Sequence, residues 1–129
     1  MQLRILVVDD NPSIRHSLCC FFELHPEWEI CGEAADGLEA VRSAFDLHPD
    51  VIIMDLEMPR LNGLEATRRI HRLSLSTRVL ILTLHENSIL PKIAQDAGAQ
   101  GYVLKTQPLE VLARAIETLG YSDTFFVSS

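Results

Sequence analysis

The sequence has few cysteines and no long hydrophobic run. Its three cysteines show no CxxC spacing, and two of them, Cys19 and Cys20, are adjacent. This pattern indicates reduced thiols rather than a disulfide framework. The apolar runs are far shorter than the roughly 20 residues of a membrane-spanning helix. The first residues lead into a short apolar run that Asp9 ends, unlike a signal peptide. A cytoplasmic protein that does not contact a membrane is therefore expected.

Positive charge is also scarce. Lys and Arg number 11 against 18 Asp and Glu, which gives a net charge of −7. Because nucleic acid is anionic, this chain is not expected to bind DNA or RNA by itself. The five histidines show no paired metal-binding spacing. With 129 residues and 47% hydrophobic residues, the chain has the size and composition of one globular domain.

Two periodicities alternate along the chain. Short apolar runs, typical of strands buried on both faces, occur at Leu3–Val8, Trp28–Ala34, Val51–Met54, Val79–Leu82 and Gly101–Leu104. Segments with helical spacing separate them, and the last helical stripe ends at Leu119. Five βα repeats predict an α/β fold: a five-stranded parallel sheet with helices on both faces. Right-handed crossovers and the flavodoxin-like pattern give the strand order 2-1-3-4-5.

Helix boundaries carry their own signals. Asn11 followed by Pro12 predicts an N-cap and a proline in the first helical turn. Gly98 stands where a helix would end before the last strand. Residues 1–119 are therefore expected to form one domain, and residues 120–129 a C-terminal tail.

Polar residues follow the predicted strands where parallel sheets bind ligands. Asp9 and Asp10 end the first strand, Asp55 the third, Thr83 the fourth and Lys105 the fifth. Singly, an Asp here is a common turn or cap residue and a Lys a common surface charge. Together, three acids about 5 Å apart would repel by roughly 3 kcal/mol per pair at an effective dielectric of about 20. A hard cation such as Mg²⁺ would offset that repulsion.

These residues belong to four longer blocks that resemble a known family. The chain resembles a two-component response regulator receiver domain over essentially its whole length, through the blocks Val7-Val8-Asp9-Asp10-Asn11, Asp55 to Gly63, Leu82-Thr83 and Gly98 to Lys105. The resemblance implies that Asp55 is the phosphoacceptor. It implies that Mg²⁺ is the cofactor, held by Asp9, Asp10, Asp55 and the backbone carbonyl of Glu57.

Three further roles follow from the resemblance. Thr83 and Lys105 match the switch hydroxyl and the phosphoryl-binding lysine, and Tyr102 matches the aromatic switch residue. The alternative for Tyr102 is a ring half-packed against the last strand. Glu57 and His85 each lie two residues beyond a site residue, and they are candidates to tune the lifetime of the phosphoryl group.

The family resemblance also implies partners. A sensor histidine kinase would donate the phosphoryl group, and the domain would act as a signalling switch rather than as an enzyme for external substrates. A phosphorylation-linked homodimer is a further expectation. DNA would be bound only through an output domain outside this chain.

Thr106 replaces the proline that often follows the lysine, which leaves open whether the Lys105–Thr106 bond is cis. Together with His85-Glu86-Asn87, this variant points to the branch with a C-terminal helix-turn-helix domain, the LuxR/NarL-like regulators. The apolar residues of the 120–129 tail then predict the start of a linker to such a domain.

Two other functions use a similar fold or acidic residues. A Mg²⁺-dependent phosphatase with an aspartyl nucleophile would carry Asp-x-Asp after the first strand, whereas this chain has the adjacent pair Asp9-Asp10. A flavodoxin-like FMN carrier would have a loop rich in Ser, Thr and Gly at that position. The acidic loop found there disfavours phosphate unless a metal intervenes.

Overall fold

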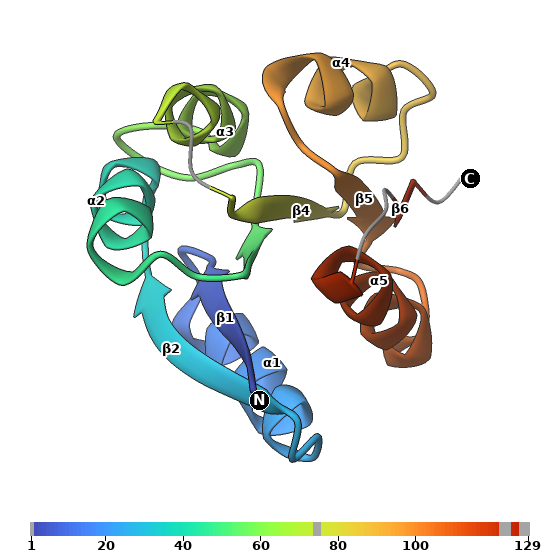
Figure 1. Ribbon diagram of the computed structural model, residues 1–129. Coiled ribbons are helices and arrows are strands. Elements are labelled where there is room, and N and C mark those ends of the chain that lie inside the picture. The colour runs from blue at the N-terminus through green and yellow to red at the C-terminus, as the bar shows by residue number, and fades with distance from the viewer. Residues whose placement is uncertain (1, 74–75, 122–124, 127–129) are drawn as a thin grey trace.

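The fold consists of five βα units and a short terminal strand (Figure 1). The computed structural model describes residues 2–73, 76–121 and 125–126. In chain order the elements are β1 (Leu3–Val8), α1 (Pro12–Glu23), β2 (Trp28–Ala34), α2 (Gly37–Leu47), β3 (Val51–Met54), α3 (Gly63–Arg72), β4 (Arg78–Thr83), α4 (Leu90–Ala97), β5 (Gly101–Leu104), α5 (Leu109–Tyr121) and β6 (Phe125–Phe126).

All strand pairs are parallel, and the sheet order is β2-β1-β3-β4-β5-β6. This confirms the predicted order 2-1-3-4-5 of the first five strands. The sixth strand was not expected: Phe125 and Phe126 pair with Gly101 and Tyr102 at the β5 edge. From β1 the chain adds β2 on one side of the sheet, and then crosses to add β3, β4 and β5 on the other side. The switch point of the sheet therefore falls between β1 and β3.

The segment expected to be a tail contributes to this architecture. Helix α5 ends at Tyr121, so the predicted boundary after Leu119 falls inside the helix. A Cβ atom on Gly120 would lie 3.0 Å from the Leu3 side chain, which is a reason for glycine at this position within the helix. Residues 122–124 and 127–129 of the expected tail lie outside the described residues.

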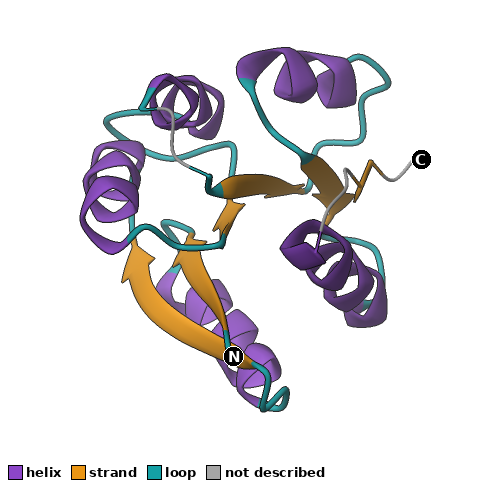
Figure 2. Ribbon diagram, in the orientation of Figure 1, coloured by secondary structure: helices purple, strands orange, loops and turns teal. Residues whose placement is uncertain are grey.

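Helices cover both faces of the sheet, as Figure 2 shows. Helices α2, α3 and α4 pack on one face, and α1 and α5 on the other. Alternate residues of β1 face opposite sides of the sheet. Leu6 and Val8 pack in the core under α2, α3 and α4, and Ile5 and Val7 pack in the core under α1 and α5. Burial on both faces explains why the strands read as continuous apolar runs.

The predicted helix boundaries are present. The side chain of Asn11 accepts hydrogen bonds from the amides of Ser13 (2.9 Å) and Ile14 (3.2 Å), with Pro12 in the first turn of α1. Gly98 ends α4 with φ of 111°, a left-handed conformation that favours glycine.

Two further observations concern the backbone and the helices. No peptide bond among the described residues is cis, so the Lys105–Thr106 bond is trans. No helix in the described ranges is both long and apolar enough to cross a membrane.

Candidate functional site

The three predicted acids meet at the carboxyl ends of β1 and β3. Asp9 and Asp55 are buried, with 2% and 8% of their surface exposed, whereas Asp10 is exposed. One carboxylate oxygen from each of the three lies within 4.8 Å of the others. The parallel pairing of β1 with β3 produces this convergence, because both strands end at the same edge.

Lys105 reaches the acids from the end of β5. Its Nζ lies 3.0 Å from Asp9 Oδ2 and 3.3 Å from Asp55 Oδ1. Burial acts against the ammonium, but the hydrogen bond to Asp9 and the charge of Asp55 outweigh it and raise the pKa of Lys105. One cation therefore compensates two of the three carboxylates.

The environment of Asp55 differs from that of a surface carboxylate. Burial, above all, raises its pKa, Asp9 adds to that effect, and Lys105 opposes it. Asp55 Oδ1 accepts the Leu56 amide at 3.0 Å and also contacts Lys105. Within the described part of the chain, Oδ2 accepts no hydrogen bond.

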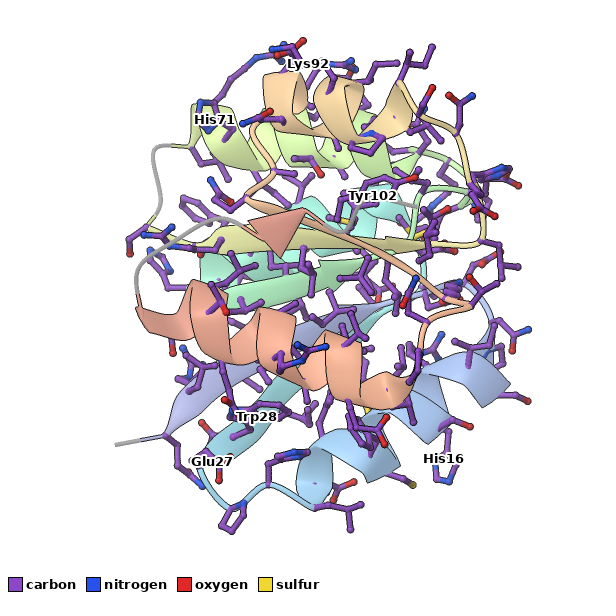
Figure 3. All side chains as sticks on the ribbon, turned by 90° about the vertical axis from the view of Figure 1, so that its right-hand side faces the viewer. His16, Glu27, Trp28, His71, Lys92 and Tyr102 are labelled. Carbon is purple, nitrogen blue, oxygen red and sulfur yellow. The ribbon has the colours of Figure 1, made fainter. Side chains whose placement is uncertain are left out.

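Thr83 and Tyr102 are connected through the backbone of His85. Thr83 Oγ1 accepts the His85 amide at 3.1 Å, and the Tyr102 hydroxyl donates to the His85 carbonyl at 2.8 Å. The ring of Tyr102 lies between the sheet and the α3–α4 layer (Figure 3) and is 1% exposed. The ring is therefore fully packed in the core rather than half-packed, and its role as a switch residue stays a prediction.

The site opens into a pocket of about 250 Å³. All the predicted residues except Tyr102 line it, and Leu84 contributes to the wall as well. The exposed side chains of Glu57 and His85 contact each other through Oε1 and Nε2. The two candidate tuning residues are thus brought together, although they are 28 positions apart.

Sequence reasoning missed two groups around the site. Arg15 donates to the Asp9 carbonyl at 2.7 Å and pairs with Glu33 at 3.0 Å. Arg60 pairs with Asp36 across two loops. The N-cap position of Asp36 before Gly37 was a readable local signal, but no local pattern identifies its distant partner.

A doubly wound parallel sheet with three acids and a lysine at its carboxyl edge is the arrangement expected of a receiver domain. The family model for the response regulator receiver domain matches residues 5–117. The chain belongs to this family, and the resemblance identified from the sequence motifs is confirmed.

The relatives include transcriptional regulators. The transcriptional regulatory protein LiaR of Bacillus subtilis is 41% identical over 89% of this chain and 54% of its own length. A LuxR-family two-component response regulator from Aurantimonas has a TM-score of 0.93 at 37% identity, covering 97% of this chain and 89% of that one. The response regulator domain of Thermotoga maritima CheB has a TM-score of 0.87 at 34% identity, covering 95% and 99%. The chain spans about half the length of the first curated relatives.

Proposed function

We propose that this domain is a phosphorylation-dependent switch that accepts a phosphoryl group from a sensor histidine kinase on Asp55. The observation that carries the proposal is the convergence of Asp55 with two further acids and Lys105 in one open pocket. The order of the acids along the chain disfavours a phosphatase, and the relatives are regulators rather than phosphatases.

The contacts of Asp55 favour one of its oxygens as nucleophile. Oδ1 is occupied by the Leu56 amide and Lys105, which leaves Oδ2 to attack phosphorus in line. The Oδ2–P bond forms as the P–N bond to the donor imidazole breaks. Lys105 can contact a phosphoryl oxygen as a point charge after its contact with Asp55 breaks.

The acid cluster fits a magnesium ion. Three carboxylates face one ammonium, so the site carries excess negative charge and offers the oxygen ligands that Mg²⁺ prefers. Asp9, Asp10, Asp55 and the backbone carbonyl of Glu57 would hold the ion. Bound Mg²⁺ would offset the charge of the phosphoryl oxygens during transfer.

The hydrogen bonds around His85 connect Thr83 in the site with Tyr102 in the core. A phosphoryl group would attract the Thr83 hydroxyl as a donor, while the same oxygen already accepts the His85 amide. Movement of Thr83 would therefore shift His85, whose carbonyl holds the Tyr102 hydroxyl. In this way the phosphoryl group on Asp55 would shift the equilibrium between two positions of the β4–α4 loop relative to β5.

Glu57 and His85 are proposed to tune the lifetime of the phosphoryl group. Their side chains contact each other in the pocket wall, where water would approach Asp55. Substitution of both residues is expected to change the rate of dephosphorylation by more than about twofold. An unchanged rate would show that the two residues line the pocket without affecting dephosphorylation.

Intact mass measurement tests the phosphoacceptor. A small phosphodonor with Mg²⁺ should add one phosphoryl mass to the wild type and none to Asp55→Asn. Asp96→Asn makes an equal change of charge at an exposed position of α4. It serves as the control and should retain the adduct. Persistence of the adduct in Asp55→Asn would refute the assignment, and continuous turnover of a phosphomonoester would favour the phosphatase alternative.

We further propose that the domain regulates transcription through a DNA-binding domain encoded beyond residue 129, as the names of its relatives suggest. The reading frame should then continue for roughly 60–90 residues. The isolated domain, with a net charge of −7, should not bind DNA at physiological salt. Specific DNA binding by residues 1–129 alone would contradict this proposal.

A further inference from the structure

The loop that follows Asp55 is attached at its far end to another part of the molecule. Residues 55–62 connect β3 to α3 and include Glu57. In the second half of this loop, Arg60 Nε donates to Asp36 Oδ2 at 3.0 Å, and a second guanidinium nitrogen lies 2.9 Å from the same oxygen. Asp36 stands between β2 and α2, so the pair, called here the Asp36–Arg60 clamp, joins two loops at the carboxyl edge of the sheet.

Asp36 is a rigid anchor for this contact. It is buried, and its other oxygen, Oδ1, accepts the Glu39 amide at 2.8 Å as the N-cap of α2. The Glu39 amide and, in addition, Arg60 hold the pKa of Asp36 below its usual value, despite its burial. The carboxylate is therefore fully engaged: one oxygen fixes the helix and the other fixes the loop.

The backbone of the loop shows that this path is imposed on it. Arg60 has φ of 67°, a left-handed conformation that non-glycine residues adopt only when their surroundings compensate its cost. Beside it, the Leu61 carbonyl approaches so closely that a Cβ atom on Gly37 would lie 2.1 Å away. The loop closes with a hydrogen bond of 2.9 Å from the Gly63 amide to the Leu56 carbonyl.

We propose that the Asp36–Arg60 clamp holds the β3–α3 loop in the path that places Glu57 beside the three acids, and so sets the affinity of the site for Mg²⁺. Both members are positioning residues, since they contact neither the pocket nor its acids. This inference rests on the proposed Mg²⁺ site, and it extends that site to a pair of residues outside it.

Electrostatics alone and the clamp predict opposite effects of replacing Arg60 on the affinity for Mg²⁺. Arg60 is a cation near a cation site, so electrostatics alone predicts that Arg60→Gln tightens Mg²⁺ binding. The clamp predicts the reverse, because a loosened loop must be ordered when the ion binds. Residues that orient metal ligands typically contribute 10–100-fold to affinity. For a pair whose arginine side chain is 61% exposed, we expect a weakening of roughly three- to tenfold.

Calorimetric titration with Mg²⁺ measures this effect in the 129-residue chain. Arg60→Gln and Asp36→Asn should each weaken binding, and the double variant should lose little more than either one, because both remove the same contact. Asn at position 36 can still cap α2, so the fold is preserved. Lys92→Gln is the matched control: it removes one positive charge from an ion pair on α4 and should leave affinity unchanged or slightly tighter.

Hydrogen exchange in the metal-free protein gives a second readout that does not depend on Mg²⁺. The Gly63 amide should exchange several-fold faster in Arg60→Gln than in the wild type, while amides of β1 stay protected. Normal Mg²⁺ binding by the wild type, with unchanged or tighter binding by Arg60→Gln, would overturn the clamp alone. Failure of the wild type to bind Mg²⁺ would overturn the proposed site and the affinity claim together.

Discussion

Replacing Asp10 by asparagine should stabilise the metal-free protein. Asp10 lies within 4.8 Å of two other carboxylates, and Lys105 pairs with those two rather than with Asp10. At about 5 Å, each repulsion amounts to roughly 3 kcal/mol at an effective dielectric of about 20 and to roughly 1 kcal/mol in water. Asp10 is exposed, so the lower figure applies, and attraction to Lys105 offsets one of the two repulsions. The net gain for Asp10→Asn is on the order of 1 kcal/mol.

The same substitution should reduce stabilisation by Mg²⁺. An ion that binds only the native state adds about 2.7 kcal/mol at one hundred times its dissociation constant, and loss of a ligand removes most of that gain. Urea denaturation with and without Mg²⁺ measures both effects. Glu117→Gln, an equal charge change on the exposed face of α5, controls for the net charge and should show neither. If Asp10→Asn is less stable without metal and keeps its full Mg²⁺ response, the three acids do not form the proposed site.

Other predictions concern the core and the thiols. Tyr102→Phe should lower the free energy of unfolding by about 1 kcal/mol, because the buried phenol donates a 2.8 Å hydrogen bond to a backbone carbonyl; an unchanged urea midpoint would contradict this. Gly63→Ala should cost more than about 2 kcal/mol, since its Cβ would lie 2.0 Å from the Asp55 carbonyl oxygen; a wild-type melting temperature would refute the close approach. Burial foremost raises the pKa of Cys19 to about 11, so iodoacetamide near pH 8 should label exposed Cys20 and spare Cys19, as peptide mapping would show.

Local patterns in the sequence predicted most of the sheet. The strands were readable because both faces are buried, which turns each into an unbroken apolar run such as Val51–Met54. Helix α3 followed only from the repeat: its buried face includes the small residues Ala66 and Thr67, and its remaining surface is strongly basic. The positions of the site acids followed from topology, because parallel strands deliver their carboxyl ends to one edge.

The tertiary structure decided how those residues contact one another. That Lys105 pairs with Asp9 and Asp55 but not with Asp10 depends on distances from the end of β5 to the ends of β3 and β1. The full burial of Tyr102 depends on how the α3–α4 layer packs against the sheet. Neither property has a signature within a few residues of the side chain concerned.

The loops show the same division most clearly. Asp36 could be identified as a helix cap from its neighbours, since capping is a local hydrogen bond. Its contact with Arg60 joins residues 24 positions apart and depends on a left-handed backbone angle in the β3–α3 loop. Periodicity and capping act over a single turn or strand, so the sequence determines elements and their ends, whereas contacts between loops arise only when the packed sheet and helices bring the loops together.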